Sequence, residues 1–211
     1  LLLLSASTVL IAAAGYIVND YYDVKIDYIN KPERVVIGKS ITRRFAILFH
    51  VVFSALGILI GFYLSWTIAA VNTLSVFLLW LYSNNLKRQP FVGNLTVALL
   101  TGAAIFVVDM LYGAHSSLVV IYALFAIFMT LVREIIKDIE DLKGDNTFGC
   151  KTLPIIWGIR KTKSIIYTIL IVFSGSVIVL NKHYEILPSP YYLLFLFGPL
   201  TWFLFRLYLA D

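Results

Sequence analysis

The feature that most constrains this chain is a series of long apolar runs without charged side chains. Several stretches of 18 or more residues contain no Lys, Arg, Asp or Glu, which is enough to cross a hydrocarbon core about 30 Å thick. Only 14% of the 211 residues are charged and 60% are hydrophobic, whereas a soluble domain usually carries about 25% charged residues. The sequence therefore predicts an all-α, polytopic membrane protein. It excludes a soluble enzyme, a disordered chain and a nucleic-acid-binding module.

Seven apolar runs have about the length of a membrane-spanning helix. They cover residues 1–18, 45–64, 66–82, 92–112, 116–133, 163–181 and 190–208. A very short hairpin at Ser65 and Trp66 separates the second run from the third. The strands of a membrane barrel would be about 10 residues long with alternating polarity, and no such alternation is present. The sequence therefore predicts seven spanning helices.

The basic residues predict the orientation of these helices. Sixteen of the seventeen Lys and Arg residues fall on one side, and only Lys182 falls on the other. The positive-inside rule makes the basic side cytoplasmic, so we expect a multi-pass protein of the cell membrane. The net charge of +5 then concerns orientation and anionic ligands rather than DNA. Nine of the twelve acidic residues also lie on this side, and topology does not explain them, because acidic residues contribute little to it.

A repeated motif accounts for most of these acidic residues. The pattern D-x-x-D-x-x-x-D occurs twice, offset by 118 residues, as Asp20, Asp23 and Asp27 and again as Asp138, Asp141 and Asp145. At about 100° per residue, each copy places its carboxylates on one stripe of a helix, with Asn19 in the first stripe and Glu134 in the second. Gly144 is a residue that can end the second helix early. The chain is thus expected to form two pseudo-repeated halves, each presenting one acidic cluster at the same membrane face.

The composition of the two stripes indicates their ligand. Like charges at i,i+3 and i,i+4 repel by a few tenths of a kcal/mol per pair, so two such stripes at one membrane face favour a cation between them. Ligands that are all oxygen suit Mg²⁺, particularly beside a phosphate-rich substrate. The Lys and Arg residues among the acids suit a diphosphate. A single motif of this kind could be a solvated helix end, but two matched copies argue for a site.

The two motifs resemble those of the UbiA superfamily of intramembrane prenyltransferases. That family's N-D-x-x-D-x-x-x-D, followed by N-K-P-x-R, is matched from Asn19 to Arg34. Its K-D-x-x-D-x-x-G-D, followed by T-L-P and a glycine, is matched from Lys137 to Gly158. The likeness extends through residues 82–87 and 93–94. It implies a single domain over residues 1–211 in a fold of nine helices around a central cavity, and the first and last of these helices are expected to lie outside these seven spans.

The resemblance also implies roles for individual residues. Members transfer a prenyl group from an isoprenyl diphosphate to an acceptor, here expected to be membrane-associated, with the tail between helices. The catalytic carboxylates would be Asp23, Asp27, Asp141 and Asp145. The Mg²⁺ ligands would be these four with Asn19, Asp20 and Asp138. The substrate-binding residues would be Asn19, Arg34, Tyr82, Lys87, Asn94 and Lys137, although Tyr82 and Lys87 are five positions apart where many members have four.

The residues constrain the identity of the acceptor less than they constrain the type of reaction. The two motifs are most similar to the branch that adds a geranylgeranyl group to geranylgeranylglycerol phosphate for ether lipids. An aromatic acceptor of a quinone pathway, either 4-hydroxybenzoate or dihydroxynaphthoate, is the enzymatic alternative. A cation-coupled transporter is a more remote one, and a CDP-alcohol phosphotransferase would need a D-x-x-D-G motif that is absent. The oligomeric state stays open. Asp109 is expected at the rim of its helix, and Cys150 has no assigned role.

Overall fold

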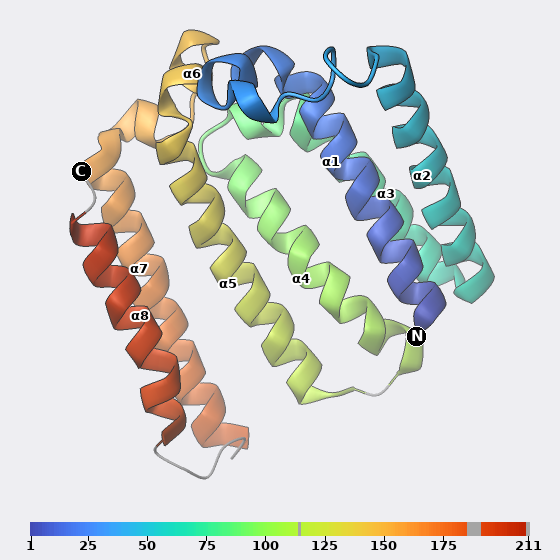
Figure 1. Ribbon diagram of the computed structural model, residues 1–211. Helices are drawn as coiled ribbons and strands as arrows, with labels where there is room; N and C mark the ends of the chain where they lie inside the picture. The colour runs from blue at the N-terminus through green and yellow to red at the C-terminus, as the bar shows by residue number, and fades with distance from the viewer. Residues whose placement is uncertain (114, 185–190, 210–211) are drawn as a thin grey trace.

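The computed structural model describes residues 1–113, 115–184 and 191–209, and these residues form helices joined by short connections (Figure 1). The spanning-length helices and the short helical turns, in chain order, are α1 (Leu2–Asn30), η1 (Pro32–Arg34), α2 (Arg43–Leu64), α3 (Trp66–Asn84), η2 (Leu86–Arg88), α4 (Val92–Tyr112), α5 (Ser117–Glu140), α6 (Leu142–Thr147), α7 (Leu153–Tyr184) and α8 (Tyr191–Leu209). No strand occurs in the described part of the chain, which confirms the all-α prediction.

Six of these helices, α1 to α5 and α7, are long and apolar enough to cross a membrane. They coincide with the first six predicted runs, and α8 occupies the seventh. Many large apolar side chains face outward, among them Phe45, Leu59 and Ile171, which is expected where lipid is the solvent. The hairpin between α2 and α3 is also confirmed. Ser65 alone separates the two helices, and its hydroxyl accepts a hydrogen bond from the Thr67 N–H at 3.1 Å.

The helices run up and down, so that the connections after α1, α3 and α5 lie at one end of the bundle. Figure 1 shows α6 and the C-terminal end of α1 side by side at this end, whereas the α4–α5 connection lies at the opposite end. Both acidic motifs are therefore at the same end of the molecule. This arrangement agrees with the alternation of spans that the basic residues predicted.

The first three helices pack closely because small residues line their contacts. Ser54, Gly57 and Gly61 are buried on α2, and small residues let helix backbones approach in a membrane. The Asn72 side chain on α3 crosses this junction. Its amide donates to the Ser7 hydroxyl at 2.7 Å and to the Gly57 carbonyl at 2.9 Å. These hydrogen bonds satisfy a polar group at a depth where it would otherwise be costly.

Two apolar clusters hold the bundle, one toward the end opposite the motifs and one around the C-terminal end of α5. One joins α1, α3 and α4 through Leu4, Ile68 and Val107. The other joins α4, α5, α7 and α8, and its fully buried members include Ile135, Ile166 and Leu170. Helix α4 belongs to both clusters, and the end of α5 is anchored by Leu131, Val132 and Ile135 in the second one.

The two motifs differ in backbone structure. The first lies on α1, which continues to Asn30, as the predicted stripe requires. The second does not lie on one helix, so the prediction of a single stripe is wrong there. Helix α5 ends at Glu140, Asp141 has the non-helical dihedral angles φ −89° and ψ 6°, and Asp145 lies on α6. The chain breaks three residues before Gly144, where the end of α1 packs against it.

Helix α7 begins earlier than the apolar run predicted, at Leu153 rather than near residue 163. Pro154 is in its first turn, where the missing N–H has no partner to lose. A kink follows at Gly158, with φ 78°, a dihedral that glycine adopts without steric cost. The T-L-P and glycine positions of the second motif therefore shape the start of α7.

Candidate active site

Both acidic motifs line one cavity of about 340 Å³ at the end of the bundle. Its carboxylates come from α1 (Asp20, Asp23 and Asp27), from α5 (Glu134 and Asp138), and from the α5–α6 junction and α6 (Asp141 and Asp145). The basic residues on its wall are Lys31, Arg34, Lys87, Arg133 and Lys137. The structure therefore brings together side chains separated by 118 residues, as the repeated motif predicted.

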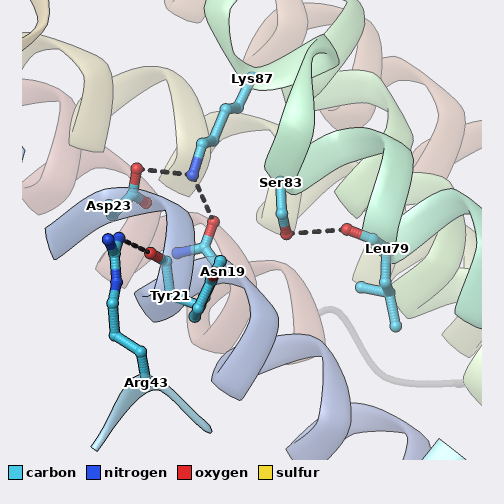
Figure 2. Close-up of polar contacts among 7 residues, drawn as sticks. All are labelled: Asn19, Tyr21, Asp23, Arg43, Leu79, Ser83 and Lys87. Atoms are coloured by element: carbon cyan, nitrogen blue, oxygen red, sulfur yellow. Dashed lines mark hydrogen bonds and ion pairs between the residues drawn. The ribbon is translucent and has the colours of Figure 1, made fainter. Parts of the chain in front are cut away.

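In the first motif, Lys87 holds two of the predicted ligands together. Figure 2 shows its ammonium between Asn19 and Asp23, at 3.1 Å from Asn19 Oδ1 and 2.5 Å from Asp23 Oδ1. Lys87 comes from η2, so the α3–α4 connection is bound to α1. On the other face of α1, Arg43 donates to the Tyr21 carbonyl at 3.3 Å and lies over the Tyr21 ring.

In the second motif, Asp141 and Asp138 each have a partner from a different element. Lys31, just past the end of α1, forms an ion pair with Asp141 at 2.7 Å. The Asn94 amide on α4 donates to Asp138 Oδ2 at 2.9 Å. Asn94 is buried, and it supports Asp138 rather than lining the acidic cavity. Its predicted contact with substrate stays a prediction.

Burial and mutual repulsion raise the proton affinity of this cavity. Desolvation, together with repulsion from the neighbouring Asp141 and Asp23 carboxylates, raises the pKa of the Asp145 carboxyl to about 6. Desolvation lowers the pKa of the Lys87 ammonium, although Asp23 opposes that shift. Seven carboxylates line this cavity against five basic side chains, so negative charge is in excess there. Such a cavity attracts cations.

The donor set fits a divalent cation that is shared with a ligand. Among the described residues, no three His, Cys, Asp or Glu side chains converge closely enough to hold an ion by themselves. Mg²⁺ usually keeps several waters and takes one or two carboxylates together with substrate phosphates. Carboxylates on two opposite walls of a 340 Å³ cavity leave room for a diphosphate between them. The residues present therefore fit Mg²⁺ bound with an anionic substrate.

Two further cavities, lined mainly by apolar side chains, adjoin the acidic one and share lining residues with it. The first, of about 390 Å³, runs between α1, α3 and α4 and shares Asn19, Asp20 and Tyr82 with the acidic cavity. The second, of about 750 Å³, lies against α5, α7 and α8 and shares Lys31 and Arg34 with it. Arg133 and Lys137 line all three cavities. The polar chamber thus adjoins two apolar chambers, one toward each half of the bundle.

Some residues of this site were not singled out from the sequence. Lys31 belongs to the N-K-P-x-R segment, but nothing in the pattern favoured it over Arg34 as a direct partner of the acids. Arg34 is largely exposed on η1 and lies 4.0 Å from Glu33. Arg133 pairs with the buried Glu134 at 2.6 Å. Their place beside two extended acidic motifs was visible in the sequence, but their contacts were not.

Polar residues elsewhere in the described chain have structural roles. Asp109 is buried rather than at a rim, and its carboxylate accepts a hydrogen bond from the Ser116 N–H at 2.9 Å, which closes the α4–α5 connection. Asn72 binds α1 and α2 to α3, as described above, and also lines the 390 Å³ cavity. Cys150 is buried at the wall of the acidic cavity, and its burial raises the pKa of the thiol.

Comparisons with known proteins agree with this architecture. The digeranylgeranylglyceryl phosphate synthase of Thermococcus sibiricus is 40% identical over 156 residues, which cover 72% of this chain and 54% of that protein. A solved structure concerned with digeranylgeranylglyceryl phosphate synthase in membranes matches with a TM-score of 0.71 at 26% identity, covering 99% of this chain and 73% of the other. The chain thus spans about half the length of the first of these relatives.

A further solved structure shows the same fold. The UbiA homologue from Archaeoglobus fulgidus, bound to DMAPP and Mg²⁺, matches with a TM-score of 0.66 at 17% identity, covering 84% of this chain and 66% of the other. The profile described as the UbiA prenyltransferase family matches residues 1–211, which is the whole chain. With six helices long enough to span a bilayer, the protein is an integral, multi-pass membrane protein, and it belongs to the UbiA prenyltransferase family.

Proposed function

We propose that this protein transfers a geranylgeranyl group from geranylgeranyl diphosphate to geranylgeranylglycerol phosphate, with Mg²⁺ as cofactor. The observation that carries the proposal is the single acidic cavity that both motifs line and that adjoins two apolar cavities. A reaction between two amphiphiles needs this combination of one polar chamber and two apolar ones. The name of the Thermococcus sibiricus relative and the ligands of the Archaeoglobus fulgidus homologue support the same reaction.

The donor fits the acidic cavity and the 390 Å³ cavity together. Its diphosphate would lie between Asp23, Asp27, Asp141 and Asp145, with Lys87 and Lys137 as cationic partners. Its tail would follow the apolar wall past Tyr82 toward Ile11, Leu79 and Leu100. Asn19, Asp20 and Tyr82 line both cavities, so they would surround the allylic carbon, where the polar and apolar parts of the donor meet.

The reaction breaks the allylic C–O bond, and the bonding pair leaves with the diphosphate. Mg²⁺ held by Asn19 and the six motif aspartates would supply electrostatic stabilisation of that leaving charge. Lys87 and Lys137 add fixed positive charge inside the cavity, where it is screened less than in open water. The acceptor hydroxyl oxygen then bonds to the allylic carbon. Its proton goes to a carboxylate of the cavity, which acts as the general base.

The 750 Å³ cavity favours a lipid acceptor over an aromatic acid. Lys31, Arg34, Arg133 and Lys137 lie at its polar end, and Phe125, Met129, Phe173, Leu200 and Phe203 line the rest. A phosphate head group would find four cations there, and a prenyl chain would fill the apolar part. An aromatic acid has no long apolar chain to place in it. The position of both motifs at helix ends also disfavours a transporter, whose ion sites lie near the midplane.

An assay with defined substrates tests this function. The natural protein, purified in detergent, would receive radiolabelled geranylgeranyl diphosphate with geranylgeranylglycerol phosphate, 4-hydroxybenzoate or dihydroxynaphthoate. We expect product with the glycerol phosphate acceptor only, loss of turnover with EDTA, and recovery with Mg²⁺. If product forms only with an aromatic acid, that acid is the acceptor and the glycerol phosphate assignment is wrong. Turnover that is unaffected by EDTA would overturn the Mg²⁺ assignment.

We also propose that the acidic cavity faces the cytoplasm. The basic residues of the three connections at that end support this orientation. Single cysteines at Lys39, Gln89 and Lys161 should react with an impermeant thiol reagent only from the cytoplasmic side, and a cysteine at Ser116 only from outside. Labelling of the Gln89 position from outside would contradict the proposed orientation.

A further inference from the structure

The break between α5 and α6 interrupts the backbone hydrogen bonds that a continuous helix would make. The Asp141 N–H still bonds to the Lys137 carbonyl at 2.9 Å, and it closes the last turn of α5. Helix α6 begins at the next residue, so its first N–H groups have no partner within the helix. The Gly144 N–H is one of these, and it is buried. A group from elsewhere must therefore satisfy it.

That group is the side-chain amide of Asn30, the last residue of α1. Asn30 Oδ1 accepts a hydrogen bond from the Gly144 N–H at 2.8 Å. Asn30 Nδ2 donates to the Asp141 carbonyl at 3.1 Å. One amide thus binds both sides of the break across a sequence separation of more than 110 residues. Asn30 also follows Asp27 by three residues, which is about one helical turn.

The approach of Asn30 requires a glycine at position 144. A Cβ at this position would lie 2.5 Å from Asn30 Nδ2, 2.6 Å from Oδ1 and 2.7 Å from Cγ. These separations are shorter than van der Waals contact, so a side chain at position 144 would displace the amide. Lys31 adds a second link beside the first, through its ion pair with Asp141.

We propose that Asn30 is a positioning residue that sets the separation between the two acidic motifs. Its amide joins the end of α1 directly to the α5–α6 break. It therefore keeps Asp141 and Asp145 at a fixed distance from Asp23 and Asp27. The inference rests on the proposed function, in which both motifs bind the same Mg²⁺-diphosphate unit. Asn30 itself does not line the acidic cavity and would act only through the aspartates.

The chemistry of the site explains why this separation matters. An ion that is shared between two walls needs both walls at the right distance, and no three described carboxylates hold it from one side. Residues that orient metal ligands typically change metal affinity about 10- to 100-fold when they are mutated. A loose α5–α6 break would let Asp141 and Asp145 move away from α1, and the ion would lose half of its protein ligands.

A double-mutant cycle on purified protein tests the proposal. Mn²⁺ alone serves as the probe, and the EPR signal of the free ion reports binding without substrate or turnover. We expect Asn30→Ala and Gly144→Ala each to weaken Mn²⁺ binding by about 10-fold or more. The double variant should bind no more weakly than Asn30→Ala, since a Cβ at position 144 finds space once the amide is gone. Such non-additivity is the signature of direct contact.

Gly102→Ala is the matched control. A Cβ there would lie 2.4 Å from Ile127 Cγ1, between α4 and α5 and outside the three cavities. This variant should lower the thermal unfolding temperature and leave Mn²⁺ affinity unchanged. Wild-type Mn²⁺ affinity in both Asn30→Ala and Gly144→Ala would overturn the proposal. Fully additive losses in the double variant, or an equal loss in Gly102→Ala, would also overturn it.

The outcome separates this inference from the proposed function. If the variants change Mn²⁺ binding as expected but the protein prenylates none of the acceptors, the positioning role stands and the proposed reaction fails. If the reaction proceeds with Mg²⁺ but Mn²⁺ affinity is independent of Asn30, the reaction stands and the positioning role fails.

Discussion

The two acidic motifs have the same pattern but different backbones. The first lies on the uninterrupted helix α1, and Lys87 holds its Asn19 and Asp23. The second is divided between α5, the non-helical Asp141 and α6. Equal spacing in the sequence therefore specifies the same kinds of ligand without specifying the same geometry. An ion pair also links the two motifs, because Lys31, which follows the first motif, binds Asp141 of the second.

One pair of equivalent positions accounts for much of the difference. Ile26 in the first motif corresponds to Gly144 in the second, given the offset of 118. Ile26 is buried on α1, where it contributes apolar packing to the helix. Gly144 has no side chain, and the Asn30 amide occupies the space that a Cβ would need. The first motif is thus held by its own helix, and the second by a contact with the first.

A proline in each motif should give the largest difference between the two. Lys25 and Lys143 are equivalent exposed lysines. Proline at position 25 removes an interior hydrogen bond of α1, so Lys25→Pro should cost about 3 kcal/mol or more of stability and abolish activity. Lys143 is in the first turn of α6, where Lys143→Pro should cost about 1 kcal/mol at most. Thermal unfolding and turnover measure both. Equal losses would mean that the two backbones are not held differently.

Removing one carboxylate from each motif tests whether the two walls act together. Asp23→Asn and Asp141→Asn keep the side-chain volume and remove one anionic ligand. Each should lower kcat at least about 100-fold, as when a transition-state charge loses its main stabiliser. Asp109→Asn is the control, because that buried aspartate closes the α4–α5 connection at the other end, and it should keep most of the activity. Near wild-type rates in both motif variants would refute the shared site.

The two lysines that hold the motifs should differ in importance. Lys87 pairs with Asp23 with a side-chain exposure of 10%, whereas Lys31 pairs with Asp141 at 25%. Lys87→Met should raise the KM for the prenyl diphosphate about 10-fold, because hydrogen bonds to charged groups are worth about 1.5–3 kcal/mol when buried. Lys31→Met should have a smaller effect, of about 3-fold, because solvent screens the pair more. Steady-state kinetics that reverse this order would contradict the comparison.

The smallest effect concerns pH. The pKa of Asp145 is about 6 in the folded protein without metal and 3.8 in the unfolded chain, so the folded state binds more protons between these values. Stability without metal should therefore fall as pH rises from about 4 to about 6. Mg²⁺ competes with that proton, so it should raise the melting temperature by about 2 °C more at pH 7.5 than at pH 5.5. Asp145→Asn should make the difference smaller.

Much of the architecture could be predicted from the residues alone. The absence of charge over long stretches predicted the spanning helices, and six of them are confirmed. The spacing of Asp20, Asp23 and Asp27 predicted the first stripe. The repeat of this spacing also predicted that Asp138, Asp141 and Asp145 would face the same site, because both motifs follow spanning helices that end on the same side of the membrane. These inferences depend only on local periodicity and on the alternation of helices across a membrane.

The helix break at Asp141 could not be predicted in the same way. The sequence pointed to Gly144 as the residue that could end the helix, yet α5 ends at Glu140. The break depends on backbone groups that pair with Asn30, which is more than 110 residues away in the chain. The roles of Lys31 and Asp109 were also missed, because each depends on which neighbour packing brings close.

The sequence by itself therefore determined the chemistry of this protein: membrane helices, two sets of oxygen ligands, and cations enough to bind a phosphate. These features follow from side-chain type and spacing, which are local properties of the chain. Only the tertiary structure decided that one motif stays helical while the other breaks, that Lys31 and Asn30 cross between them, and that two apolar cavities meet at one acidic chamber. Contacts between distant segments depend on packing of the whole bundle, and no local pattern encodes them.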